Sequence, residues 1–281
     1  SGESAQEISG HTAFYNLTQN NEAGISIQAT GSVDIVNTLK LSSGTFNSNG
    51  NLRLVSNSSG TARLAKVEDG ASLNGSITLE RHVSGKTPGW DFLQTPLMGQ
   101  TIADWQDDFT IQGAFNGKNP SVYYYDEPSS QWLPANDLST PASYSRGMRV
   151  YWWADQLVDG QLTIDNTGPV QTGTVNIPLT KSGEYEGGGW NLIGNPYPCE
   201  IDWDAPGGAW DKSAINNSYY VWDGANRAYR AYVGANGDNM GVGTADLTRY
   251  IASSQAFFVY AAAAGNLTVT EDAKVEQPGV T

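Results

Sequence analysis

Residues 189–203 read Gly-Trp-Asn-Leu-Ile-Gly-Asn-Pro-Tyr-Pro-Cys-Glu-Ile-Asp-Trp, and a shorter relative begins at residue 89 with Gly-Trp-Asp-Phe-Leu-Gln-Thr-Pro-Leu. In both stretches a Gly-Trp pair opens a short apolar strand, a proline turn follows, and a tryptophan, Trp105 or Trp203, closes the unit. The opening residues Trp90 and Trp190 lie one hundred positions apart. This spacing predicts a duplicated structural unit.

Four further segments recur in the same order at similar offsets: 75–79 with 173–177, 121–127 with 218–224, 145–151 with 254–260, and 162–164 with 267–269. The ordered recurrence predicts two homologous β-sandwich or jelly-roll-like repeats, 75–170 and 171–281. Each holds about five short strands, which suits a small sandwich or half of a larger one. The sequence leaves open whether the repeats stand in tandem or pair into one body.

Upstream of the repeats, residues 14–74 show short strands with apolar residues two positions apart, as in Val33-Asp34-Ile35 and Leu52-Arg53-Leu54. This alternation points one face of each strand inward. Asn and Gly cluster at 47–51, where left-handed turns are expected. The pattern favours a β-solenoid of a few rungs, with an antiparallel meander as the alternative. Residues 1–13 are small and polar and are expected to form an N-terminal tail.

Composition supports an all-β protein and excludes some classes of partner. The chain has 281 residues, 32 of them Gly, and no long helical period. Its formal charge of −14 and pI near 4.4 make nucleic-acid binding improbable. We expect no membrane insertion and find no leader in the sequence, so any leader is expected to have been removed.

Residues suited to catalysis are few. Only two histidines are present, and Cys199 lies in a proline-flanked turn, where an inert buried thiol is expected. Paired acids could serve a glycosidase or a lyase, and the candidates are Asp104, Asp107, Asp108, Asp202 and Asp204. Such clusters are usually solvated turns, so we expect no enzyme. No cofactor is expected.

Aromatic residues are the richest signal for binding. Exposed rings can stack on sugars or pack at a protein interface, and Trp132, Trp153 and Tyr229 are the candidates because they lie near loops or strand ends. Calcium is a weaker possibility that rests on ligand type alone, with Asp223, Asn226 and Asp238 as candidate ligands. Both Asp-Gly and Asn-Gly pairs are first of all hairpin turns.

Several stretches resemble a module of secreted Bacteroidota surface proteins. They are 39–52, 59–63, Gly-Trp-Asn-Leu-Ile-Gly-Asn-Pro-Tyr-Pro at 189–198, Tyr-Val-Trp-Asp-Gly at 220–224, and 251–259. In that group such modules often precede a type IX sorting domain, which is cleaved after export. The resemblance implies a secreted, cell-surface location and this architecture, and it transfers no active-site residue. No sorting domain follows Thr281 in this sequence.

The leading expectation is a non-enzymatic extracellular structural or adhesive protein of the bacterial cell surface. We expect it to associate with copies of itself, with the N-terminal tail adding as a strand to a neighbour's open sheet and building a filament or a surface assembly. The alternative is a carbohydrate-binding module, which would take a glycan as its partner. A glycosidase or lyase is the third reading.

Overall fold

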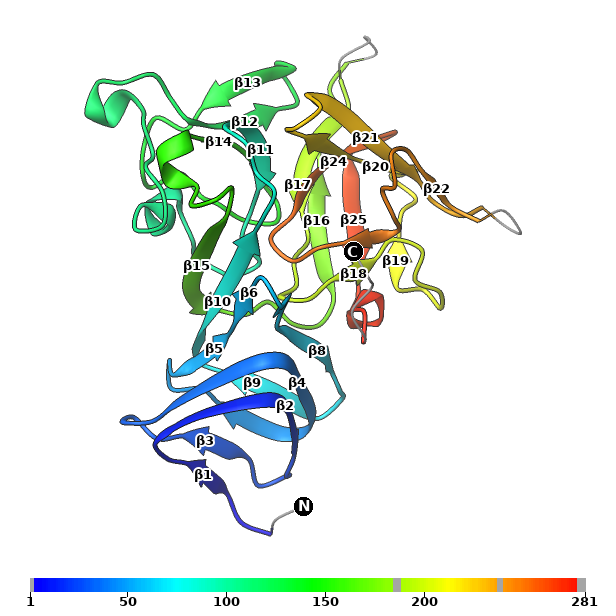
Figure 1. Cartoon of the computed structure of the whole chain (residues 1–281). Helices are drawn as coiled ribbons and strands as arrows, with labels where there is room; N and C mark the ends of the chain where they lie inside the picture. Colours follow the sequence, from blue (N-terminus) through cyan, green and yellow to red (C-terminus); the bar gives the residue numbers. More distant parts are fainter. Residues whose placement is uncertain (1–2, 184–187, 237–239, 277–281) are drawn as a thin grey trace.

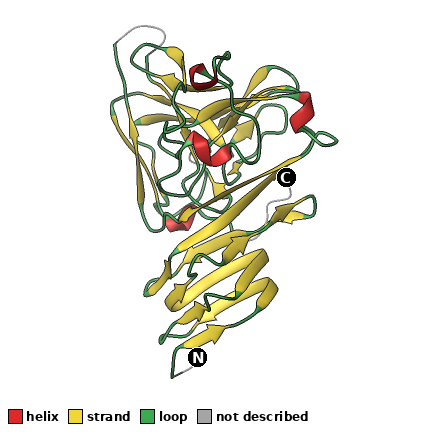
Figure 2. Cartoon of the chain, turned by 90° about the vertical axis from the view of Figure 1, so that its left-hand side faces the viewer, coloured by secondary structure: helices red, strands yellow, loops and turns green. Residues whose placement is uncertain are grey.

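A computed structural model describes residues 3–183, 188–236 and 240–276. The protein is all-β, and within the described residues the only helices are four short 3-10 segments: η1 (Ile102–Trp105), η2 (Ala114–Asn116), η3 (Ala154–Gln156) and η4 (Glu271–Ala273). A solenoid-like stack holds the N-terminal strands, and the two repeats lie together at the other end of the molecule (Figure 1). The side view shows the same division, with the strands of the stack layered one above another (Figure 2).

The stack is built from parallel strands. They are β1 (Gln6–Ile8), β2 (His11–Asn20), β3 (Ile25–Ile27), β4 (Ser32–Asn47), β5 (Leu52–Leu54), β8 (Arg63–Val67), β9 (Ala71–Asn74) and β10 (Ser76–Val83). Val33 pairs with Leu52, and Leu52 pairs with Ile77, so that apolar residues from successive rungs lie above one another. Because all of these pairings are parallel, they identify a solenoid and not an antiparallel meander.

Two features of sequence produce this stack. Alternating apolar residues point inward, and Val33, Ile35, Leu52 and Leu54 are fully or almost fully buried in one core. At the predicted corner, Asn49 and Gly50 adopt the left-handed conformation, with φ of 49° and 76°. A short hairpin, β6 (Ser56–Asn57) and β7 (Gly60–Thr61), leaves the stack before β8.

The N-terminal segment differs from the expected tail. Gln6–Ile8 form β1 beside β3 of the same chain, and β2 begins at His11, so residues 6–13 largely belong to the first rung. Ile8 and Phe14 pack against the solenoid core, and Asn21 Nδ2 donates a hydrogen bond to the backbone oxygen of Ser4 (3.0 Å). A polar segment is held here because a parallel neighbour satisfies its backbone, which composition does not reveal. This segment is therefore not a free strand for a neighbouring copy.

Repeat 1 contains two sheets. One is the antiparallel pair β10 and β15 (Leu162–Pro169), which continues the solenoid sheet through the pairing of β10 with β5. The other has the order β11-β14-β12-β13, with β11 (Gly89–Leu93), β12 (Val122–Asp126), β13 (Gln131–Pro134) and β14 (Met148–Trp152). Side chains from β15 and from the four-stranded sheet share one core, which includes Ile164, Val122 and Val150.

Repeat 2 has the same arrangement. Its smaller sheet has the order β16-β25-β19, and the larger has β17-β24-β20-β21-β22. The strands are β16 (Val175–Leu179), β17 (Trp190–Gly194), β19 (Trp210–Asp211), β20 (Ile215–Asp223), β21 (Ala228–Val233), β22 (Val242–Gly243), β24 (Ala256–Ala261) and β25 (Gly265–Val269), with β18 (Ile201–Asp202) and β23 (Tyr250–Ile251) as a separate pair. The recurrent segments thus occupy equivalent strands, which confirms that the repeats are homologous.

The tryptophans that close the two units are core anchors. Trp105 and Trp203 are both fully buried. Trp105 Nε1 donates to Asn166 Oδ1 (3.1 Å), and Trp203 Nε1 donates to Asn217 Oδ1 (3.0 Å). A buried indole N–H needs an acceptor, and each repeat supplies an asparagine for it.

The repeats pack against each other reciprocally. β11 lies against β20, while β17, the counterpart of β11, lies against β12, the counterpart of β20. The backbone N–H of Gln94 donates to Ser254 O (3.1 Å) and that of Gly194 donates to Tyr144 O (2.7 Å). Gly194 is the counterpart of Gln94, and a Cβ there would lie 2.1 Å from Gln94 Cγ. These paired contacts describe an approximate two-fold relation between the repeats.

The solenoid is joined to both repeats. β10 pairs with β5 of the solenoid on one side and with β15 of repeat 1 on the other, and its Ile77 and Leu79 lie in the solenoid core. β8 docks on repeat 2 near η4, where Val67 N donates to Glu271 Oε2 (3.1 Å) and Lys274 Nζ donates to Ala65 O (3.3 Å). The three parts therefore enclose a common junction.

The partly buried carboxyl of Asp108, close to β15, predicts a pH effect on stability. Burial, together with the nearby Asp165, Asp107 and Glu80 carboxylates, raises the pKa of Asp108 to about 7, although the Asp165 N–H donates to Asp108. In the unfolded chain this pKa is near 4. The folded state therefore holds the proton more tightly, and stability falls as pH rises from about 4 to about 7.

We expect Asp108→Asn to raise the free energy of unfolding at pH 8 by about 1–2 kcal/mol, a value discounted for partial exposure of the group. At pH 4 the gain should be nearly absent, because Asp108 is then protonated in the folded state. Urea denaturation at both pH values measures this difference, with the exposed Asp155→Asn as the control. An equal gain at both pH values would contradict the assignment.

Candidate functional site

A cleft of about 630 Å³ lies at the junction of the solenoid and the two repeats. Its walls come from the β6–β7 hairpin, the start of β8, the end of β10, the end of β11, the end of β14, and two segments of repeat 2 at 199–200 and 252–255. Its size falls within the range of small-molecule sites. Because all three parts of the chain contribute, the cleft exists only in the assembled fold.

Arg81, at the end of β10, is the central charge of the cleft. Surrounding protein atoms lower the pKa of its guanidinium through desolvation, while Asp91 and Glu200 oppose that effect electrostatically. Among the described residues the guanidinium makes no hydrogen bond and no ion pair. A charged group that is partly desolvated and unpaired is unfavourable for the empty protein, and a bound anion would relieve that penalty.

Two further polar atoms at the cleft have no partner. Trp152 is only 2% exposed, and its Nε1–H meets no acceptor. The Nε2 atom of His82 is likewise buried without a partner, while its Nδ1 lies 3.0 Å from Thr163 Oγ1. Such unpaired buried atoms are rare in folded proteins, and both of these are closed off from solvent, so they border the cleft without facing a ligand in it.

The remaining polar lining is mixed. Arg63 is almost buried and is held by Thr38 Oγ1 (3.0 Å) and Asn37 Oδ1 (2.8 Å). Lys86 forms an ion pair with Asp91. Hydroxyl groups come from the hairpin and from the 252–255 segment, namely Ser58, Ser59, Thr61, Ser253 and Ser254. In a chain with a net charge of −14, the cleft gathers three cations and two carboxylates.

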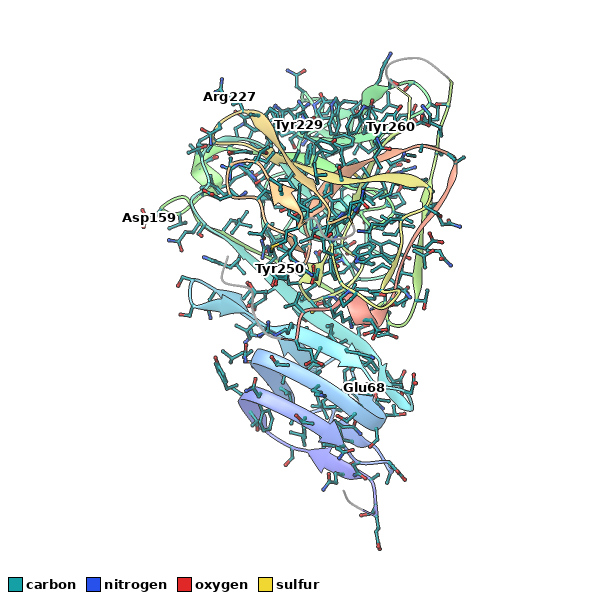
Figure 3. The ribbon with its side chains drawn as sticks, turned by 90° about the vertical axis from the view of Figure 1, so that its right-hand side faces the viewer. Glu68, Asp159, Arg227, Tyr229, Tyr250 and Tyr260 are labelled. Carbon is teal, nitrogen blue, oxygen red and sulfur yellow. The ribbon has the colours of Figure 1, made fainter. Side chains whose placement is uncertain are left out.

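The predicted aromatic residues lie elsewhere. Trp132 and Tyr229 come together at the contact between the repeats, where both pack on Phe92 and Phe258 with ring centroids 5.8–6.2 Å apart. Tyr125 also contacts Trp132, with ring centroids 5.5 Å apart. Tyr229 is 52% exposed and lies at the end of the molecule far from the solenoid (Figure 3). Trp153 is separate, and its ring meets Tyr151 at 5.0 Å. Trp132 is thus largely a packing residue, whereas Tyr229 still offers an exposed ring.

The predicted calcium ligands are engaged in a hairpin turn. Asp223 accepts hydrogen bonds from Asn226 Nδ2 (2.6 Å) and from Arg230 Nε (2.7 Å). These bonds, that of Asn226 first, lower the pKa of Asp223 to about 2. Asp238 lies outside the described residues. In the portion of the chain that the structure describes, no group of three or more acidic, His or Cys residues is placed to hold a metal ion.

The acidic pairs considered for catalysis also serve local structure. Asp104 accepts from Thr101 N (2.7 Å), Asp202 pairs with Arg249, and Asp204 accepts from Tyr232 Oη (2.6 Å). Cys199 borders the cleft but is buried, and burial raises the pKa of its thiol to about 11. A thiol with this pKa is protonated at neutral pH and is a poor nucleophile.

Sequence reasoning missed Arg81 and Trp152. One signal was available: Arg81 and His82 are consecutive basic residues at the end of a strand in a strongly acidic chain. No local pattern could have indicated that Trp152 and the 252–255 segment meet them, because they approach only when the repeats pack.

The fold defines an all-β protein in which a short parallel solenoid carries two homologous β-sandwich repeats. Comparison with protein-family models, with curated proteins and with solved structures found no match for this chain. None of the helices in the described ranges is long and apolar enough to cross a membrane. Functional assignment therefore rests on the geometry alone.

Proposed function

We propose that this chain is a non-enzymatic extracellular adhesion protein of a bacterial cell surface that associates with copies of itself. The observation that carries self-association is the outer edge of the solenoid. β1 pairs with β3 and β2 pairs with β4, and no described strand covers their other edges. An uncovered edge of parallel strands presents backbone donors and acceptors to another chain.

The residues at this edge support the proposal. Tyr15, on β2, is 68% exposed, and the apolar side chains of Ile8 and Phe14 are only partly buried. No lysine or arginine lies between residues 1 and 39, so the edge lacks the cations that most often discourage strand addition, and Glu7 is the one charged residue on β1. Figure 1 places β1 and β2 at the end of the stack remote from the repeats.

We expect the double variant Ala13→Lys/Tyr15→Lys to weaken self-association at least about tenfold, because it places two cations on the open edge. Both side chains are exposed, so the fold should be retained. Analytical ultracentrifugation over a concentration series, together with electron microscopy, gives the readout. The matched control is Val158→Lys, which adds a cation at an exposed site on repeat 1. Association that is equal in all three proteins would contradict the proposal, and so would a wild-type chain that stays monomeric throughout.

The second candidate is carbohydrate binding, and the junction cleft favours it. Hydroxyl, indole, guanidinium and carboxylate groups line one concave site of suitable volume. Sugars are recognised by such mixtures of donors and acceptors, since each hydroxyl both donates and accepts. Adhesion and glycan binding are compatible, because the cleft and the open edge lie on different parts of the molecule.

A further inference from the structure

The charges of the junction cleft define which ligand it can hold. Arg81 is the unpaired cation, whereas Lys86 is already paired with Asp91, and Arg63 is already bonded to Thr38 and Asn37. One free guanidinium matches one carboxylate, which it can bind through two parallel hydrogen bonds.

Two acids limit the charge of the ligand. Asp91 and Glu200 both line the cleft and act electrostatically on Arg81. A dianionic phosphate would be repelled by Glu200 and more weakly by Asp91, whose charge Lys86 offsets, whereas a singly charged carboxylate meets half of that repulsion beside Arg81. Carboxylates are also the acceptors to which sugar hydroxyls donate most strongly.

The hydroxyl lining provides a second, independent observation. Serine and threonine hydroxyls from the hairpin and from the 252–255 segment supply donors and acceptors for the hydroxyls of a sugar. Trp152 forms part of the wall, and its ring is fixed by an edge contact with Phe109 at 4.9 Å.

We propose that the junction cleft binds an oligosaccharide that carries a single carboxylate, such as one with a single uronate residue, with that carboxylate on Arg81. This inference rests on the carbohydrate-binding candidate given above and specifies its ligand. The hydroxyl-rich lining distinguishes such a sugar from a peptide C-terminus, which carries one carboxylate but no array of hydroxyls. Because solenoid and repeats both contribute walls, ligand binding would also strengthen their attachment.

The test uses isothermal titration calorimetry of the full chain with an aldotriouronic acid, a trisaccharide that carries one uronate, and with its methyl ester, which has nearly the same size but no charge. We expect the acid to bind at least about tenfold more tightly than the ester, in line with a charge-assisted hydrogen bond. Arg81→Gln should remove that preference. Arg227→Gln, an exposed arginine remote from the cleft, is the matched control and should bind as wild type does (Figure 3). If Arg81→Gln does not fold, Arg81→Lys, which keeps the charge but cannot form two parallel hydrogen bonds, should weaken binding of the acid several-fold.

Each other outcome has a defined meaning. Equal binding of acid and ester would overturn the carboxylate assignment and leave carbohydrate binding in place. Binding of neither sugar would overturn both the carboxylate assignment and the carbohydrate-binding candidate. If a hydroxyl-free carboxylate such as acetate, or a short peptide with a free C-terminus, bound as tightly as the aldotriouronic acid, the site would be an anion site and the sugar assignment would fail.

Discussion

Replacement of Trp203 by alanine is expected to lower the free energy of unfolding by about 4 kcal/mol, which is enough to deprive repeat 2 of a stable fold. The indole is fully buried and meets the rings of Trp210 (5.1 Å) and Tyr219 (5.3 Å). Its removal would leave a cavity and would also leave Asn217 Oδ1 without the indole N–H. Lys212 Nζ, 4.7 Å from the ring centroid, would lose its cation–π contact.

Urea denaturation followed by far-ultraviolet circular dichroism measures this loss. The control is Trp153→Ala, since Trp153 is only half-buried and touches Tyr151 at one edge; we expect a change of about 1 kcal/mol or less. The loss of unfolding free energy for Trp203→Phe should lie between those of Trp203→Ala and Trp153→Ala, because phenylalanine keeps a ring but has no N–H donor. A Trp203→Ala protein as stable as Trp153→Ala would show that the closing tryptophan is not the anchor of the repeat.

Glu127→Ala is expected to cost about 3 kcal/mol, because it removes the carboxylate that holds repeat 1 to repeat 2. Glu127 is 3% exposed and accepts hydrogen bonds from Ser182 N (2.8 Å), Ser182 Oγ (2.9 Å) and Gly189 N (2.7 Å). Without the carboxylate, two backbone N–H groups near the contact between the repeats lose their acceptor.

The same contact has a defined pH dependence. Burial alone would raise the pKa of Glu127, but the hydrogen bonds from Ser182 and Gly189 outweigh it and lower the pKa. A lowered folded-state pKa contributes stability above the unfolded pKa near 4.5, and that stability disappears as pH falls through the folded pKa. Glu127→Gln should therefore be destabilising at pH 7, with a difference that shrinks toward pH 3.

Denaturation of wild type and of Glu127→Gln across this pH range checks the prediction. The control is Glu68→Gln on the solenoid, whose carboxylate is exposed and lies 3.9 Å from Lys40 (Figure 3). We expect that change to remain within about 0.5 kcal/mol at every pH. A Glu127→Gln effect that does not vary with pH would show that packing, and not the ionised carboxylate, holds the repeats together.

Local periodicity and turn residues were sufficient for most of the architecture. The strands around Val33 and Leu52 were predicted from alternation, and the corner at Asn49 and Gly50 from the residues that tolerate left-handed backbone. The duplication was predicted from the order and spacing of the similar segments alone. Such segments remain similar in sequence because they form equivalent strands in the two repeats. In contrast, the inclusion of residues 6–13 in the first rung was missed. This polar segment is held by backbone pairing with adjacent strands of the same chain, and not by its own side chains.

The candidate cleft could not be predicted in the same way. Arg81 was overlooked because its role depends on the residues around it: Asp91 belongs to the next strand, and Glu200 and Trp152 come from distant points of the chain. Trp132 was predicted as a binding candidate from its position near a strand end, and the structure shows it half-buried. The partner that covers it, Phe258, belongs to the other repeat.

The stretch at residues 189–203 illustrates which features the sequence determines and which the tertiary structure determines. Its sequence by itself determined a strand, a proline turn and a tryptophan anchor, because backbone restriction and side-chain volume act within a few residues. Only the tertiary structure decided that Gly194 meets Gln94 across the contact between the repeats, and that Cys199 and Glu200 border a cleft with Arg81. Such contacts depend on the packing of surfaces that are far apart in the chain, and no local pattern encodes them.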